Sequence, residues 1–159
     1  MGRRIGRVRW HWALFLIMAF GQLEKGGALA MAASFMSATD PATVLYDAPS
    51  LKAKKRFIVN QGYPLEVQVQ TKGWFKVRDQ TRALSWVQSK QVSNTPRMVM
   101  VKVPLANVRQ SAEDNAAVRF QVAQNVLLEL TESLPGGWFH VQHRDGSTGY
   151  LRTTQVWGG

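Results

Sequence analysis

Residues 41–157 contain short stretches in which apolar and polar side chains alternate. In residues 65–69 (LEVQV) every second residue is apolar, which is the period of a half-buried β-strand. Phe75 and Val77 share one face of the next predicted strand, whereas Trp74 and Lys76 share the other. The polar, glycine-bearing stretch 144–149 is typical of a turn between two strands. The pattern predicts an all-β fold without helices.

The pattern occurs twice along the chain. The most visible pair is GWFKV at 73–77 and GWFHV at 137–141. Shifting the chain by 63 positions, and by 64 after one extra residue near Pro135, aligns fourteen identical residues in order. We infer a duplicated module of about 50 residues, with five or so short strands in each copy. Strands of this number and length suit a small closed barrel, which leaves no exposed sheet edge.

The repeat divides the chain into four segments. Residues 1–30 precede the repeat, 41–93 form the first predicted barrel, and 105–157 form the second. Residues 94–104 are predicted to be a linker followed by a strand. This strand, at 98–103 (MVMVKV), is free on sequence grounds to pair with either barrel.

Residues 1–30 have the organisation of a secretory signal peptide. Four arginines within the first nine residues precede an apolar run at 13–20, and Ala28-Leu29-Ala30 fits a cleavage site. Ala30-Met31-Ala32 is a competing site, and an uncleaved anchor is the alternative. The apolar run is much shorter than the roughly 20 residues that a membrane span needs. We therefore expect export, with the periplasm as the default compartment, and no membrane span after cleavage. The sequence leaves the choice between the periplasm and the outside medium open.

Composition excludes several kinds of chemistry. The 159 residues include no cysteine, which excludes disulfides, thiolate nucleophiles and cysteine-bound zinc. His140 and His143 have opposite parity on a predicted strand and lack a third partner, so we expect no metal. Glu113 and Asp114 lie in a polar loop, and the chain has neither a G-x-S-x-G turn nor a phosphate-binding glycine loop. The sequence predicts a binding protein, not an enzyme, without a cofactor.

Positive charge is concentrated in the first copy. The formal net charge is +10, of which residues 1–30 contribute +4. Residues 42–93 carry +6, but residues 105–159 carry −1. A cluster in the first copy supplies much of the difference and is predicted to contact an anionic surface, the alternative being a loop kept basic for solubility: Lys52, Lys54, Lys55 and Arg56.

Three motifs of the second copy resemble the bacterial Src-homology-3-like domain, SH3b. Its usual signature is an N-V-R opening, a G-W-x-x-V strand and a D-G-x-x-G-W hairpin, which compare with 107–109, 137–141 and 145–151. The first copy is similar but looser, and Arg82 stands where the second copy has Gly146. Because glycine tolerates a positive φ and arginine does not, the hairpin geometry of the first copy stays open. The resemblance implies two tandem SH3-like barrels with a non-catalytic binding role.

Aromatic side chains are the candidate ligand contacts. The predicted set is Tyr46, Trp74, Lys76 and Trp86 in the first copy, with Trp138 and Tyr150 in the second; Tyr63 and Trp157 are weaker candidates. Trp74 and Trp138 lie opposite the predicted core face, which favours a ligand. Trp86 and Tyr150 stand beside core residues, which favours packing. Lys76 beside an indole suits anionic groups, and Trp157 is interpreted as a cap on the last strand.

These features favour an exported module that binds cell-wall or envelope material, such as peptidoglycan peptides or an anionic envelope surface. The alternative is an adaptor that binds an envelope protein and no glycan. A basic small barrel also suits nucleic acid, but the export signal and the modest charge of the mature chain argue against it. We therefore expect no nucleic acid as a partner. The sequence leaves the oligomeric state and the orientation of the two barrels open.

Overall fold

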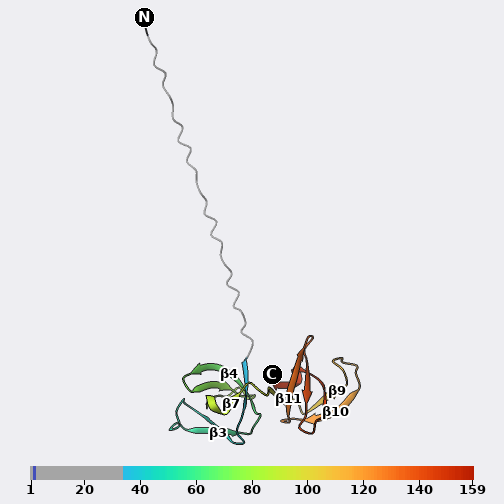
Figure 1. Ribbon diagram of the computed structural model, residues 1–159, viewed down its shortest axis with the longest axis horizontal. Helices are drawn as coiled ribbons and strands as arrows, with labels where there is room; N and C mark the ends of the chain where they lie inside the picture. Colours follow the sequence, from blue (N-terminus) through green and yellow to red (C-terminus); the bar gives the residue numbers. More distant parts are fainter. Residues whose placement is uncertain (1, 3–33) are drawn as a thin grey trace. The chain divides into compact units, whose positions relative to one another are not determined.

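A computed structural model of the chain describes Gly2 and residues 34–159 (Figure 1). The predicted signal peptide and its cleavage sites lie outside the described residues, Gly2 excepted. Within the described part, regular structure consists of strands and two short 3-10 helices, so the predicted all-β class is confirmed. No helix among these residues is long and apolar enough to cross a membrane.

The first barrel is an antiparallel sheet of seven strands in the order β3-β2-β6-β5-β4-β1-β7. The helix η1 (Ser89–Gln91) precedes its last strand. The strands are β1 (Ser34–Ala38), β2 (Thr43–Tyr46), β3 (Lys55–Val59), β4 (Pro64–Thr71), β5 (Trp74–Arg78), β6 (Leu84–Gln88) and β7 (Val92–Ser93).

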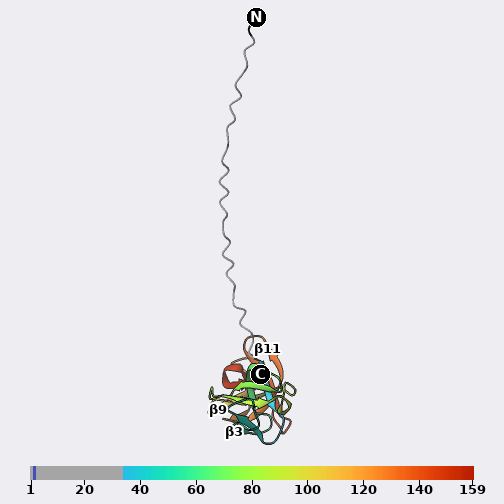
Figure 2. The same cartoon turned by 90° about the vertical axis from the view of Figure 1, so that its left-hand side faces the viewer.

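The second barrel repeats this order strand for strand, as β10-β9-β13-β12-β11-β8-β14. Figure 2 shows β9 and β11 of this barrel together with β3 of the first. The helix η2 (Thr153–Gln155) again precedes the last strand. The strands are β8 (Met98–Val101), β9 (Leu105–Arg109), β10 (Val118–Ala123), β11 (Leu127–Leu134), β12 (Trp138–Gln142), β13 (Thr148–Arg152) and β14 (Val156–Gly158).

Irregularities in the strand pairing are duplicated as well. The register between β4 and β5 shifts between Val67 and Val69, and the register between β11 and β12 shifts between Leu130 and Glu132. These positions correspond in the sequence repeat. An extra residue at a bulge changes the face of the sheet to which the following side chains point. Because both copies have the bulge at the same position, equivalent residues lie on the same face in both barrels.

The strand at Met98–Val101 belongs to the second barrel. It pairs with β11 and β14, which decides between the two pairings that the sequence left open. Its counterpart β1 pairs with β4 and β7 of the first barrel, so the first sheet begins at Ser34. In the described residues the pairing runs from β3 to β7 and from β10 to β14 without joining the two end strands.

Each barrel has its own apolar core. Leu45, Leu65, Val77 and Val87 are buried in the first. Val108, Leu128, Val141 and Leu151 are buried in the second. Phe75 and Val77 face the first core, as their shared parity predicted. Two separate cores rather than one shared core are expected if each copy buries its own sheet face.

Trp157 joins the two barrels, which belong to one compact unit. Its indole Nε1–H donates to the backbone oxygen of Pro64, 3.2 Å away. Its ring meets that of Phe35 edge-on, with 5.1 Å between centroids. The backbone of Gly158 also approaches Pro64, because a Cβ placed there would lie 2.8 Å from the proline Cβ. The interpretation of Trp157 as a cap on the last strand therefore missed its contacts with the first barrel.

The hairpin between β5 and β6 corrects the sequence argument about Arg82. This residue adopts a φ of +69°, the left-handed conformation that the glycine at the equivalent turn also adopts. Asp79 holds the turn: one carboxylate oxygen accepts from the Thr81 and Ala83 backbone N–H groups, at 2.8 and 3.0 Å. The Thr81 hydroxyl donates to the same oxygen at 2.7 Å. Hydrogen bonds that the buried Asp79 carboxylate accepts thus impose a conformation that arginine alone disfavours.

Arg82→Gly is expected to raise the free energy of unfolding by about 0.5–1 kcal/mol. Glycine removes the steric cost of positive φ, roughly 1–2 kcal/mol, but loses more chain entropy on folding. Urea denaturation measures the change. Arg119→Gly is the matched control, because Arg119 lies within β10, where glycine should destabilise. A lower urea midpoint for Arg82→Gly would show that the turn carries no strain.

Candidate functional site

Four predicted contact residues lie in one row across the first barrel. Tyr46 on β2 pairs with Lys55 on β3 and with Trp86 on β6. Trp86 in turn pairs with Lys76 on β5. Because Val77 and Val87 point into the core, their neighbours Lys76 and Trp86 lie on the outer face. We call Lys55, Tyr46, Trp86 and Lys76 the first-barrel row: two aromatic side chains with an ammonium group at either end.

Trp74 extends the aromatic part of this row. Its ring meets that of Tyr46 edge-on, with 5.5 Å between centroids and planes at 88°. Tyr46 is buried, whereas Trp74 and Trp86 are half-buried. Tyr46 therefore supports the two indoles, which keep accessible surface for a ligand. Tyr63, a weaker candidate, packs against the first core, and its pKa is raised by burial and by the nearby charge of Asp79.

The basic cluster lies beside the row, in the loop before β3 and on β3 itself. Lys52, Lys54, Lys55 and Arg56 are all exposed. Within the described residues none of the four forms an ion pair. The carboxylate of Asp47 accepts from the backbone N–H of Lys54 at 3.0 Å and so shapes the loop. Asp47 offsets one of the four positive charges locally, and the edge keeps a net positive field.

Arg56 and Phe57 shape the surface of this edge. The guanidinium lies 5.6 Å from the ring centroid of Phe57, and its Nη1 donates to the Leu84 backbone oxygen at 3.5 Å. Together with Asp47, Lys54 and Lys55, these two residues line a shallow depression of about 360 Å³. The sequence predicted the basic cluster but not its position next to the aromatic row, which depends on strand register.

The second barrel has a different row in the equivalent positions. Arg109 pairs with Val118 and with Tyr150, and Tyr150 pairs with His140. The rings of His140 and Tyr150 lie 4.8 Å apart. Glu132 lies opposite His140. The positive charge of Arg109 is matched by the negative charge of Glu132. This row has no counterpart of the two lysines of the first-barrel row.

Trp138 is covered by its own barrel, unlike Trp74. The Arg152 guanidinium lies 4.2 Å from the Trp138 ring centroid. Asp114 holds the arginine through Nε at 2.9 Å and a second contact to Nη2, and the Gly136 backbone oxygen accepts from Nη1 at 2.7 Å. The hydrogen bond from Arg152 lowers the pKa of Asp114. Trp138 is only 4% exposed, so the predicted ligand face of this residue is occupied by Arg152. We call Trp138, Arg152 and Asp114 the second-barrel clasp.

The first barrel lacks the residues of a clasp. Gln88 and Leu51 stand at the positions equivalent to Arg152 and Asp114. Leu51 is 64% exposed. The loop of the first copy is therefore not tied down over Trp74. The sequence contained a signal for this difference: Arg152 and Asp114 occur in the second copy but not at the equivalent positions of the first. Our sequence analysis missed it.

No metal-binding group forms in the described part of the chain. No three histidine, aspartate or glutamate side chains there come close enough to hold a metal. His143 instead pairs with Asp145 through Nδ1 at 3.0 Å. The backbone N–H of Ser147 also donates to Asp145, at 2.8 Å. These two groups, Ser147 first, lower the pKa of Asp145 to about 2.

The Asp145 carboxylate is expected to titrate near pH 2 in the folded protein. Its pKa lies below the ordinary value of 3.8, so its contribution to stability is complete above about pH 4 and is lost as the pH falls through 2. Carboxyl carbon chemical shifts measured by NMR against pH give the midpoint directly. In His143→Gln the midpoint should rise only in part, because the Ser147 N–H remains. A wild-type midpoint near 3.8 would contradict the assignment.

Comparison with known proteins places both copies in one family. The bacterial SH3 domain family matches residues 40–94 and 102–158. No curated protein matches. Among solved structures, NlpC2 from Trichomonas vaginalis is 16% identical with a TM-score of 0.36, and the match covers 79% of this chain and 48% of that one. An NlpC/P60 family protein from Bacillus cereus ATCC 10987 is also 16% identical, with a TM-score of 0.36 and coverage of 79% and 56%.

This chain spans about half the length of those two structures. The assignment rests on the two family matches, which cover both barrels, and on the identical strand order of the two sheets. The protein belongs to the bacterial SH3 domain family and contains two copies of that domain in tandem.

Proposed function

We propose that this protein is a non-catalytic binding module of the cell envelope and that the first-barrel row binds anionic wall material, such as carboxylate-bearing peptidoglycan peptides. The observation that carries the proposal is the row itself, Lys55-Tyr46-Trp86-Lys76, beside a cluster of unpaired cations. The proposal includes export to the periplasm under the direction of residues 1–30.

The chemistry of the row suits a flexible polymer with carboxylates. The two half-buried indoles, Trp74 and Trp86, offer rigid apolar surface at little entropic cost. Lys55 and Lys76 attract carboxylates on either side, and each exposed contact contributes only about 0–1 kcal/mol. A polymer presents many such groups, so weak contacts add through effective concentration. Binding should therefore weaken as salt is added.

A second candidate is an adaptor that binds an acidic envelope protein. Exposed apolar side chains favour it: Leu51 is 64% exposed and Ile58 is 68% exposed, and both lie close in sequence to the basic cluster. Exposed apolar side chains near polar ones are typical of a protein interface.

Lys55→Glu combined with Lys76→Glu is expected to reduce retention on insoluble peptidoglycan by about tenfold, equivalent to about 1.4 kcal/mol. The measurement is co-sedimentation of the protein without residues 1–30, at low salt and again at high salt. Lys72→Glu with Lys90→Glu is the matched control, because it makes the same charge change outside the row and the cluster.

Two outcomes would contradict the proposal. One is wild-type protein that stays wholly in the supernatant at low salt. The other is an equal loss in both double variants, which would show attraction to net charge without a site. Crosslinking from position 55 to an envelope protein, with no retention on peptidoglycan, would favour the adaptor instead.

A further inference from the structure

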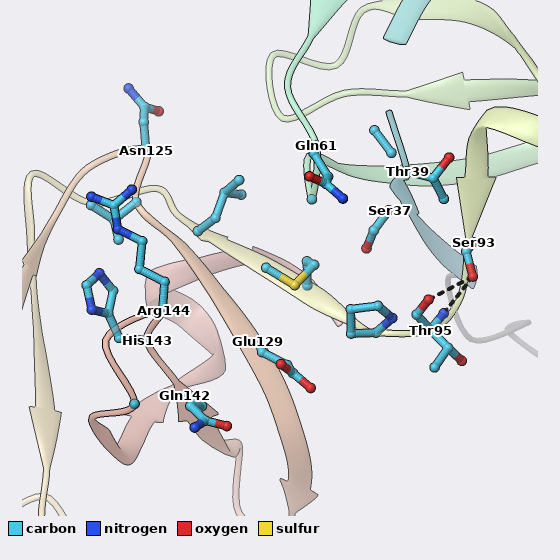
Figure 3. Close-up of a pocket in the computed structure, with 17 residues that line it drawn as sticks. Ser37, Thr39, Gln61, Ser93, Thr95, Asn125, Glu129, Gln142, His143 and Arg144 are labelled. Carbon is cyan, nitrogen blue, oxygen red and sulfur yellow. Dashed lines mark hydrogen bonds between the residues drawn. The ribbon is translucent and has the colours of Figure 1, made fainter. Parts of the chain in front are cut away.

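A hollow of about 920 Å³ lies between the two barrels, away from the first-barrel row (Figure 3). Ser37 and Gln61 belong to its first-barrel wall, and Glu129, Gln142 and Arg144 belong to its second-barrel wall. Apolar side chains, including Met98, Val126 and Leu127, line it between these polar groups. The volume lies within the range of small-molecule and short-peptide sites. The repeat could not reveal this hollow, because it requires both copies at once.

Ser37 is the first sign of a ligand. The residue is only 6% exposed, but its hydroxyl oxygen is not fully buried, and within the described residues it forms no hydrogen bond, so it is open to the hollow. Figure 3 shows this hydroxyl directed toward the hollow. A hydroxyl that is open to the hollow and free of protein partners can bind a polar ligand group there.

Two opposite charges on the second-barrel wall are the next sign. Glu129 on β11 lies in register with Gln142 on β12, and Arg144 follows two residues later. Although they line the same hollow, Glu129 and Arg144 do not form an ion pair in the described structure. His143, between Gln142 and Arg144, is already paired with Asp145. The carboxylate of Glu129 and the guanidinium of Arg144 thus remain available to a ligand.

We propose that this hollow binds a short peptide through both of its charged ends. Arg144 receives the terminal carboxylate, for which a guanidinium provides two parallel N–H donors. Glu129 accepts hydrogen bonds from the terminal ammonium group. Ser37, Gln61 and Gln142 bind the amide groups between the two ends. Small apolar side chains of the peptide rest on Met98 and Leu127.

The pair of charges selects against other ligand classes. A ligand with only negative groups meets the Glu129 carboxylate, and one with only positive groups meets Arg144. A neutral sugar can form hydrogen bonds with both groups through its hydroxyls, but it balances neither charge. Only a ligand with both charges balances the two groups. The site is separate from the proposed wall-binding row, so either can fail while the other stands.

NMR titration of the purified protein with trialanine tests the proposal. Trialanine should shift the backbone amide signals of Ser37, Gln61 and Gln142 in a saturable way. Trialanine blocked by N-acetyl and C-amide groups should bind about a hundredfold more weakly, since it loses a charge-assisted interaction at each end and each is worth about tenfold. Absence of shifts at the three residues, or equal affinity for the blocked peptide, would overturn the proposal.

Single substitutions assign each end of the peptide. Arg144→Gln and Glu129→Gln should each weaken trialanine binding by about tenfold. Glu129→Gln should leave the affinity for N-acetyl-trialanine unchanged, because that peptide lacks the ammonium group. Arg119→Gln and Glu132→Gln are the matched controls, since both residues are exposed and lie outside the hollow. Losses equal to those of the controls, or an N-acetyl peptide that still responds to Glu129→Gln, would refute the assignment.

Ser37→Ala examines the hydroxyl on the first-barrel wall separately. It should weaken trialanine binding several-fold without lowering the stability of the free protein, because no protein group pairs with that hydroxyl. Unchanged affinity, or a clear loss of stability in the free protein, would show that the hydroxyl serves the fold and not a ligand.

Discussion

Leu128→Ala and Leu65→Ala are each expected to lower the free energy of unfolding by about 2–5 kcal/mol. Both leucines are completely buried, and they occupy equivalent positions in the two cores. Truncation removes apolar contacts and leaves a cavity that the surrounding strands fill only in part. Urea denaturation followed by tryptophan fluorescence measures the loss. Leu105→Ala is the control, because its side chain is 52% exposed and should cost less than about 0.5 kcal/mol.

The same pair of variants tests whether the cores are separate. At intermediate urea, Leu65→Ala should broaden the NMR signals of the first barrel before those of Leu128 and its neighbours. Leu128→Ala should do the reverse. A cost below about 1 kcal/mol for either substitution would mean that the site collapses or is not a core position. In the Trp157→Ala background, where the Trp157 contact between the barrels is removed, simultaneous loss of all signals in both variants would point to a single cooperative core.

Trp157→Ala is expected to lower the free energy of unfolding by about 2 kcal/mol and to uncouple the barrels. A fully buried tryptophan costs about 3–5 kcal/mol when truncated, and Trp157 is half-buried. The variant loses the edge-on contact with Phe35 and the hydrogen bond to Pro64. We expect the wild-type protein to unfold in one transition and the variant in two, as measured by fluorescence and by circular dichroism.

Trp157→Phe separates the two contributions. Phenylalanine keeps an aromatic ring against Phe35 but has no N–H for the Pro64 oxygen, so it should cost about 1 kcal/mol. An alanine variant with an unchanged midpoint and a single transition would show that the barrels are coupled by other contacts. Because the hollow lies between the barrels, Trp157→Ala should also weaken trialanine binding if the peptide proposal holds.

Much of the fold could be predicted from the sequence, because the determinants are local. Alternation along 65–69 and the shared face of Phe75 and Val77 identified strands and their buried side. The repeat showed that one architecture occurs twice. β1 was missed, since Ser34–Ala38 lacks a clear alternation and follows directly on the predicted signal segment. Its role is defined only by pairing with β4 and β7.

The site was less predictable than the fold, because it depends on which residues lie opposite one another. Lys55 and Tyr46 come together only because the register between β2 and β3 shifts after Leu45. Trp138 has the same parity as Trp74, but parity does not reveal that Arg152 lies over it. Similarly, Arg82 follows Asp79, whose hydrogen bonds override the preference of arginine. Each of these outcomes is set by a neighbour rather than by the residue itself.

The second-barrel clasp has a consequence for how this duplicated protein can diversify. The Arg152 guanidinium covers the Trp138 indole of the second barrel, whereas the equivalent Trp74 of the first barrel is only half-buried. Substitutions in the loop at 47–54 can therefore retune recognition without disturbing the second barrel. Selection for stability and selection for new ligands then act on different domains of a single polypeptide.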